Sequence, residues 1–118
     1  MLQYNNITIN EVNILIKSKL LERENWLFTD EKNYFLHVTE NDCHVAVVEY
    51  RHIDEKSIFI EMIEVKDAYR GEKYSDSIIE HLQNAYCCIE AVPIEYGCSL
   101  FERNGFEEKE NSIFRWNR

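Results

Sequence analysis

The chain has 118 residues, a formal net charge of -9 and 45% hydrophobic residues. A chain of this length is expected to form one domain, residues 1–118, around a single core. The negative charge argues against general nucleic-acid binding, because neutralising phosphates requires clustered Lys and Arg. No stretch is long and apolar enough to span a bilayer, and the N-terminus lacks a basic region followed by an apolar one. We therefore expect a cytoplasmic protein without a membrane partner.

The first part of the chain predicts a helix followed by an antiparallel hairpin. Apolar residues recur at helical spacing from about residue 9 to 23. Thr8 and Glu11 have the capping-box pattern, although Asn10 is an alternative cap. Two segments rich in aromatic and β-branched residues follow at 25–40 and 44–53. The Asn and Asp between these segments favour a turn, so the two segments are predicted to pair as a hairpin.

The middle of the chain predicts a buried strand and a second helix. Residues 57–65, SIFIEMIEV, are nearly continuously apolar, which suits a central strand covered on both faces. The helix is predicted to begin near Ser75 or Asp76, both of which have suitable cap chemistry.

The last part predicts a strand, a short helix and a final strand. The strand at 87–92 ends at Pro93, the helix runs from about residue 94, and Asn104-Gly105 closes it. Residues 111–116, NSIFRW, are predicted to form an edge strand. The order of elements predicts an α/β or α+β fold with a mixed sheet.

The connection between the central strand and the second helix has the chemistry to bind an anion. Within YRGEKYSDSIIEHL, residues 69–82, Arg70 and Gly71 directly precede the helix. Main-chain N–H groups at a helix N-terminus attract anions. An ordinary strand-to-helix connection has the same sequence features, so both interpretations stay open at this point.

Two longer segments resemble the GCN5-related N-acetyltransferase (GNAT) family. Residues 58–82, IFIEMIEVKDAYRGEKYSDSIIEHL, are similar to the family's motif A, and residues 89–108, IEAVPIEYGCSLFERNGFEE, to the strand and helix that follow it. The resemblance extends over residues 34–116. It implies a GNAT-like mixed, mostly antiparallel sheet flanked by helices, which splays between two strands to admit acetyl-coenzyme A. It also implies a domain shortened at the N-terminus.

The resemblance assigns a cofactor site. The family pattern of Arg or Gln, x, x, Gly, x, Gly or Ala falls on Arg70, Gly71, Glu72, Lys73, Tyr74 and Ser75. Main-chain N–H groups of this turn are implied to hold the pyrophosphate. The strand around Ile63, Glu64 and Val65 is implied to pair with the pantetheine arm. Lys73 replaces a glycine of the family, so it either adds a cation beside the phosphates or narrows the turn with its stem.

Acetyl transfer to an amine requires a deprotonated amine positioned against a polarised thioester carbonyl. Glu61 is predicted to share a strand face with Phe59, Ile63 and Val65 and so to point into the cleft. Glu90 matches the position of a carboxylate base in other members of the family. Either glutamate is alternatively solvent-facing or ion-paired.

The proton donor for the departing thiolate is less clearly assigned. Phe101 stands where the family often has a tyrosine, and a phenylalanine cannot donate a proton. Tyr96, Tyr69 and Tyr74 are alternative acids. The four cysteines form no CxxC pair and show no repeated ligand spacing, so no metal site is predicted.

The leading hypothesis is an acetyl-coenzyme A-dependent N-acetyltransferase, an acyltransferase that acts on a primary amine of a small molecule or a protein. The acidic chain would suit a cationic acceptor. The alternative is a catalytically inactive protein of the same fold, an acidic interaction module for a basic protein partner. The exposed edge of the C-terminal strand is further expected to allow a homodimer.

Overall fold

The computed structural model describes residues 1–17, 28–71, 73–93 and 98–118. Its strands are β1 (Leu2–Ile7), β2 (Tyr34–Glu40), β3 (Cys43–Asp54), β4 (Ser57–Val65), β5 (Cys88–Ala91), β6 (Glu107–Glu108) and β7 (Phe114–Asn117). Its helices are α1 (Ile9–Lys17), α2 (Tyr74–Ala85) and α3 (Cys98–Arg103), with 3-10 turns η1 (Asp67–Tyr69) and η2 (Glu110–Ser112). None of these described helices is long and apolar enough to cross a membrane.

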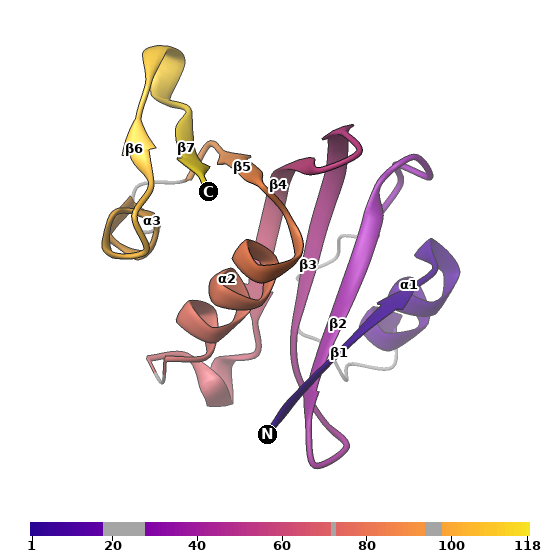
Figure 1. The fold of residues 1–118 in the computed structure, drawn as a ribbon. Helices are drawn as coiled ribbons and strands as arrows, with labels where there is room; N and C mark the ends of the chain where they lie inside the picture. The colour runs from indigo at the N-terminus through magenta and orange to yellow at the C-terminus, as the bar shows by residue number, and fades with distance from the viewer. Residues whose placement is uncertain (18–27, 72, 94–97) are drawn as a thin grey trace.

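The strands form one sheet in the order β1-β2-β3-β4-β5-β7-β6 (Figure 1). All neighbouring pairs are antiparallel except β4 and β5, which are parallel. The parallel pair requires a crossover, and α2 supplies it. The expectation of a mixed, mostly antiparallel sheet flanked by helices is therefore confirmed.

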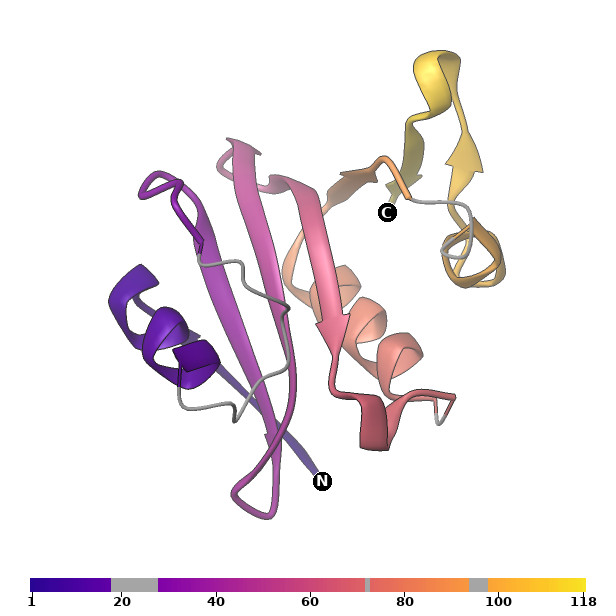
Figure 2. The ribbon, with the colours of Figure 1, turned by 180° about the vertical axis from the view of Figure 1, so that it is seen from behind.

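Helices cover both faces of the sheet. On one face, called here the α2 face, Ile78, Ile79 and Leu82 of α2 pack with Phe101 of α3 against the central strands. On the opposite face, the α1 face, α1 lies against the sheet (Figure 2). A smaller cluster there contains Val12, Ile16, Phe28, Phe35 and Val47. The central strands are therefore covered on the α2 face along their length, and on the α1 face mainly near β2 and β3.

The local signals at the start of the chain are confirmed. The Thr8 N–H donates to Glu11 Oε1 and the Glu11 N–H donates to Thr8 Oγ1, both at 3.1 Å, which is the reciprocal capping box. Asn41 and Asp42 both adopt positive φ, 51° and 65°, between the paired residues Glu40 and Cys43. This two-residue turn matches the twist of a hairpin. The predicted helix beyond residue 17 lies outside the described residues.

The two ends of the sheet differ from the prediction. β1 was not predicted, because LQYNNI lacks an alternating apolar pattern, yet it pairs with β2 from Leu2 to Ile7. The C-terminal strand β7 was predicted at an edge, but it lies between β5 and β6. The prediction was wrong because β6, only two residues long, gives too little sequence signal to be recognised. The edges of the described sheet are β1 and β6, and β6 covers β7 at Phe114 and Arg115.

Candidate active site

β4 extends beyond its parallel neighbour. β5 pairs with β4 only from Ser57 to Ile60, whereas β3 pairs with β4 as far as Val65. The Lys66 N–H donates to Val45 O on β3 at 2.8 Å, so the main-chain groups of Val65 and Ile63 point away from β3 by strand alternation. Among the described residues, no strand pairs with this side of residues 61–65. An extended ligand can therefore add to this stretch, called here the open edge of β4.

A β-bulge lies where the open edge begins. Glu49 pairs with Met62 and Tyr50 pairs with Ile60, which leaves Glu61 as the extra residue on β4. The bulge reverses the alternation of side chains along the strand. Ile60 and Val65 consequently belong to the same core cluster, although their spacing in an unbroken strand would place them on opposite faces.

The bulge corrects the predicted placement of Glu61. Glu61 was expected to share a face with Phe59, Ile63 and Val65. Ile63 and Val65 pack on the α2 face, whereas Glu61 binds Arg51, whose guanidinium lies over the ring of Phe59 at 4.5 Å. Glu61 and Phe59 therefore lie on the α1 face. The prediction took the side chains of β4 to alternate between the two faces without interruption, and the extra residue, Glu61, interrupts that alternation.

The predicted cofactor turn connects the open edge to α2. Arg70 donates from Nε to Val65 O at 2.9 Å, and its Nη1 lies 2.6 Å from Asp67 Oδ1. Gly71 adopts φ +83°, a left-handed conformation that side chains with a Cβ rarely take. The main chain then enters α2 at Tyr74, whose N-terminal N–H groups favour an anion. Glu72 of the predicted set lies outside the described residues.

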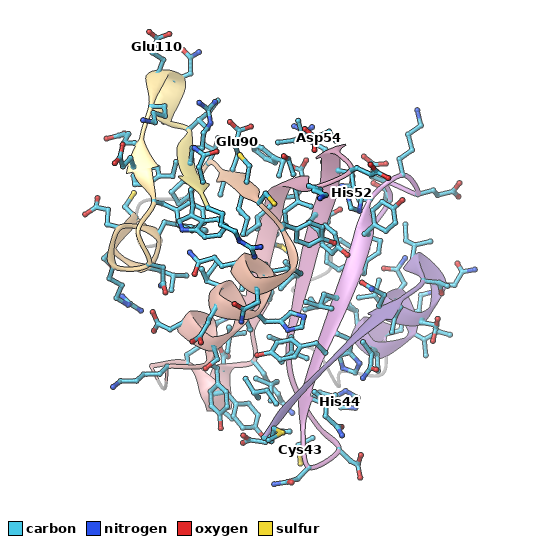
Figure 3. All side chains as sticks on the ribbon, viewed as in Figure 1. Cys43, His44, His52, Asp54, Glu90 and Glu110 are labelled. Atoms are coloured by element: carbon cyan, nitrogen blue, oxygen red, sulfur yellow. The ribbon has the colours of Figure 1, made fainter. Side chains whose placement is uncertain are left out.

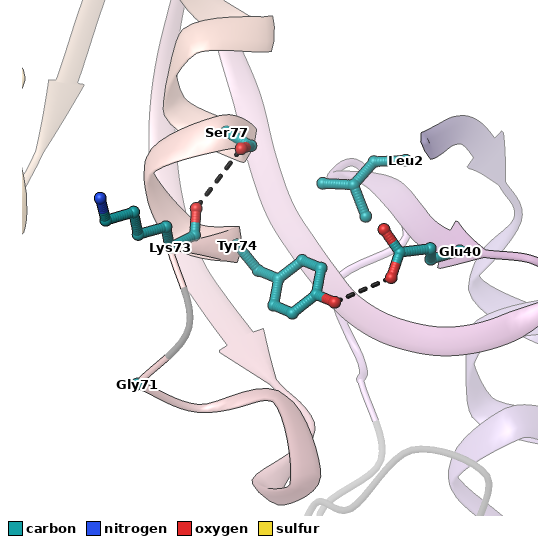
Figure 4. Close-up of a pocket in the computed structure, with 6 residues that line it drawn as sticks. All are labelled: Leu2, Glu40, Gly71, Lys73, Tyr74 and Ser77. Atoms are coloured by element: carbon teal, nitrogen blue, oxygen red, sulfur yellow. Dashed lines mark hydrogen bonds between the residues drawn. The ribbon is translucent and has the colours of Figure 1, made fainter.

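Lys73 is the N-cap residue of α2, so the helix begins one or two residues earlier than predicted. Its carbonyl oxygen accepts hydrogen bonds from the N–H and the hydroxyl of Ser77, at 3.2 and 3.4 Å. The side chain is exposed and points away from Tyr74 and Glu40 (Figure 4). Its ammonium is therefore not neutralised by Glu40. Ser75, two residues further along the chain, is half-buried.

A cavity of about 500 Å³ lies beside this turn, between α2 and the start of the sheet. The Tyr74 hydroxyl donates to Glu40 Oε1 at 2.8 Å across it (Figure 4). The Tyr74 ring also meets the Tyr69 ring edge to face, with centroids 5.3 Å apart. Both tyrosines thus belong to the turn. The cavity is lined by Leu2, Glu40, Gly71, Lys73, Tyr74 and Ser77.

A polar bridge connects α2 to α3. Asp76 accepts hydrogen bonds from Nε and Nη2 of Arg103, at 2.8 and 3.0 Å, and from Nδ2 of Asn104 at 2.8 Å. The hydrogen bond from Arg103 lowers the pKa of the Asp76 carboxyl. Phe101 lies behind this bridge in the core, edge to face with Phe106. No proton donor stands at the Phe101 position, and Tyr96 lies outside the described residues.

The two predicted carboxylates lie close to the point where β4 and β5 part. Ile89 and Ala91 of β5 pack on the α2 face, so Glu90 between them lies on the α1 face. In the register of the sheet, Arg51, Phe59, Glu90 and Arg115 follow one another on β3, β4, β5 and β7. Glu61 extends this row through Arg51, at 2.8 Å, and Glu90 binds Arg115 at 2.5 Å. Both glutamates are thus ion-paired.

The two arginines of this row were not identified from the sequence. Arg51 and Arg115 lie far apart in the chain, and no local motif contains them. Only the register places Arg115 opposite Glu90 and Arg51 opposite Phe59. A signal was available in principle, since charged residues inside otherwise apolar strands often have a partner of opposite charge on the neighbouring strand.

The fold is similar to those of known acetyltransferases. The PaiA N-acetyltransferase from Thermoplasma acidophilum, solved with coenzyme A, is 14% identical, with a TM-score of 0.69 over 100% of this chain and 99% of that one. Naa50 from Arabidopsis thaliana, solved with the bisubstrate analogue CoA-Ac-MVNAL, is 13% identical, with a TM-score of 0.71 over 99% of each chain.

A third solved structure, YhhK from Escherichia coli bound to coenzyme A, is 13% identical, with a TM-score of 0.71 over 100% of this chain and 99% of that one. Comparison with curated protein sequences gives no match. The family model for the acetyltransferase (GNAT) family matches residues 8–106, most of the chain. The predicted resemblance is thereby confirmed: the chain belongs to the GNAT family of acetyltransferases.

Proposed function

We propose that this protein binds acetyl-coenzyme A and transfers its acetyl group to a primary amine of a small molecule or a protein. The observation that carries the proposal is the open edge of β4, which leads directly into a turn and a helix N-terminus. An extended amide-bearing arm and a phosphate-bearing end need these two kinds of site in this order.

The residues present fit the cofactor. Ile63 offers its main-chain N–H and C=O to the pantetheine arm, because both point away from β3. Gly71 and the first turn of α2 offer main-chain N–H groups to the pyrophosphate, and Lys73 adds an exposed ammonium. The Arg70 side chain donates a hydrogen bond to the Val65 carbonyl oxygen, so that oxygen already has a partner at the end of the open edge. When bound, acetyl-coenzyme A supplies the activated acetyl group.

The side chains of the α1 face supply the proton chemistry. An amine acceptor is an ammonium near neutral pH and must lose a proton before it can attack a carbonyl carbon. Glu61 and Glu90 lie where β4 and β5 part, so a carboxylate is available on the face from which an acceptor approaches. The net charge of -9 favours the approach of a cationic acceptor.

Titration calorimetry with acetyl-coenzyme A tests the cofactor half of the proposal. Pantetheine, which lacks the pyrophosphate, is the matched ligand and should bind more weakly if the turn holds phosphates. Thiol release from acetyl-coenzyme A in the presence of spermidine, lysine or a short peptide with a free N-terminus tests the transfer. A flat titration at high micromolar acetyl-coenzyme A would contradict the proposal.

A second function is favoured by a different observation. Both carboxylates are ion-paired and Phe101 cannot donate a proton, which suits a protein that keeps the fold as a binding module for a basic protein. Binding of acetyl-coenzyme A without any release of thiol, together with recovery of a stoichiometric basic partner, would support this alternative. Turnover with any amine of the panel would contradict it.

We propose that any homodimer forms by pairing of β1 with β1 of a second copy. β1 is an edge of the described sheet and carries no charged side chain over Leu2–Ile7. Light scattering of the purified protein tests this, and a Gln3→Lys variant should shift any dimer toward the monomer because it adds a charge to that edge.

A further inference from the structure

Arg115 lies against Glu90 on the α1 face, and neither the motifs nor the family resemblance points to it. Its Nε donates to Glu90 Oε2 at 2.7 Å, and its Nη2 lies 2.5 Å from the same oxygen. Both nitrogens therefore hold one carboxylate oxygen. Among the described residues, no hydrogen bond reaches the other oxygen, Oε1. The pair fixes the carboxylate and keeps one oxygen available for a proton.

The Arg51 and Glu61 pair lacks this arrangement. A single Arg51 nitrogen, Nε, contacts Glu61 Oε1 at 2.8 Å, and the guanidinium is also engaged with the Phe59 ring. The Glu61 side chain is 33% exposed, against 16% for Glu90. Water competes less for a shielded carboxylate, and an orientation fixed by two nitrogens is more precise. Glu90 is therefore the better-placed proton acceptor of the two.

Arg115 can also be reached from outside the domain. It lines a cavity of about 630 Å³ in the hairpin that β6, η2 and β7 form. Glu90 lies beside the base of this hairpin, and Glu110 lies at its tip (Figure 3). Lys109, the other cation that lines the cavity, is paired with Glu107 at 3.1 Å. An acceptor that enters along the hairpin thus meets the Arg115 and Glu90 pair.

We propose, resting on the proposed acetyl transfer, that Arg115 is a positioning residue that orients Glu90 so that Oε1 accepts the proton of the amine. As the amine nitrogen bonds to the acetyl carbonyl carbon, its proton passes to Glu90 Oε1. The carbon–sulfur bond breaks and its electron pair leaves with the thiolate. The Arg115 guanidinium holds the Glu90 carboxylate through two nitrogens, and its positive charge favours the uncharged form of a nearby amine.

Other charged and titratable groups lie near Glu90. Burial raises the pKa of the neighbouring Cys88 thiol, so that residue is uncharged at neutral pH and does not compete. The remaining groups in the same row across β3, β4 and β6 are Arg51, Glu61 and Glu107.

The experiment measures kcat and KM for thiol release from acetyl-coenzyme A, with methylamine as the probe acceptor because it requires no recognition beyond its amine. Glu90→Gln should lower kcat by about 100-fold. Arg115→Gln should lower kcat about tenfold and leave the KM for acetyl-coenzyme A unchanged, because the carboxylate loses the group that orients it. Arg115→Lys keeps the charge but not the two-nitrogen contact, so it should restore only part of kcat.

Two comparisons make the result decisive. Lys56→Gln removes one positive charge at the β3–β4 turn and should leave kcat unchanged. Arg51→Gln lowers kcat only if Glu61 is the proton acceptor. A loss of kcat with Arg51→Gln and none with Arg115→Gln overturns the inference. So does wild-type protein that binds acetyl-coenzyme A yet leaves the aminolysis rate unchanged, whereas failure to bind acetyl-coenzyme A overturns the proposed function itself.

Discussion

The two halves of β4 have similar sequences and different surroundings. Residues 57–60 have β3 on one side and β5 on the other, whereas residues 61–65 have only β3 among the described strands. The difference is set by the neighbour, because β5 ends at Ala91 and Pro93 follows. Proline has no N–H to donate and is poorly tolerated inside a sheet. One half of a strand can therefore be part of the interior of the sheet, while the other half offers a free edge to a ligand.

The largest expected effect is a difference between the two halves of β4 in how much a side chain contributes to the free energy of unfolding. Ile58, in the paired half, is fully buried, and Ile58→Ala should cost about 2–5 kcal/mol of unfolding free energy because it leaves a cavity. Ile63→Ala, in the open half, should cost less, since Ile63 is only half-buried. Urea unfolding followed by circular dichroism measures both. Equal losses would show that the open edge is as tightly packed as the paired half.

Amide hydrogen exchange should also differ between the two halves of β4, because their backbone amides are protected to different extents. The Ile58 and Ile60 amides lie in the doubly paired half and should exchange slowly with or without ligand. The Ile63 amide points away from β3 and should exchange quickly in the free protein. Acetyl-coenzyme A at about 100 times its Kd should slow it by up to about 100-fold. Unchanged exchange at Ile63, with heat released in calorimetry, would place the ligand elsewhere.

Much of this arrangement is local enough to be predicted. The β4 bounds, the Thr8 and Glu11 capping box and the Asn41-Asp42 turn follow from short patterns, and the structure has all three. These features depend on residues close together in the chain. The bulge at Glu61 does not, because it is defined by which β3 residues lie opposite. A pattern of apolar residues indicates that side chains alternate along a strand, but it does not indicate the residue at which a bulge interrupts that alternation.

The acceptor side was harder to predict than the cofactor side for a related reason. Main-chain groups bind the cofactor in the proposed function, so Lys73 and Ser75 can replace smaller residues while the turn keeps its form. The chemistry of the α1 face depends on side chains from separate strands. Arg115 and Glu90 meet only because β5 and β7 pair in one register. Such contacts require the tertiary structure.

Lys73 gives a smaller effect at the cofactor turn. Its side chain is exposed and points away from Glu40 and Tyr74, so its ammonium remains available to phosphates (Figure 4). Lys73→Gln should weaken acetyl-coenzyme A binding about 3–10-fold at low salt, and less at high salt because screening reduces the attraction. Titration calorimetry at two ionic strengths measures this. Lys73→Gly tests the stem separately, and tighter binding by that variant would mean that the stem narrows the turn.

The smallest effect concerns the bridge that connects α2, which packs on β4, to α3, which follows β5. Arg103 lowers the folded-state pKa of Asp76. A lowered pKa adds stability that is fully present above the unfolded value of about 3.9 and is lost as pH falls through the folded value. Asp76→Asn should therefore be less stable than wild type at pH 7 and equal to it at strongly acidic pH. Urea unfolding across this range measures the difference. A constant deficit at every pH would mean that the bridge acts through hydrogen-bond geometry alone, so that charge plays no part in connecting the two helices.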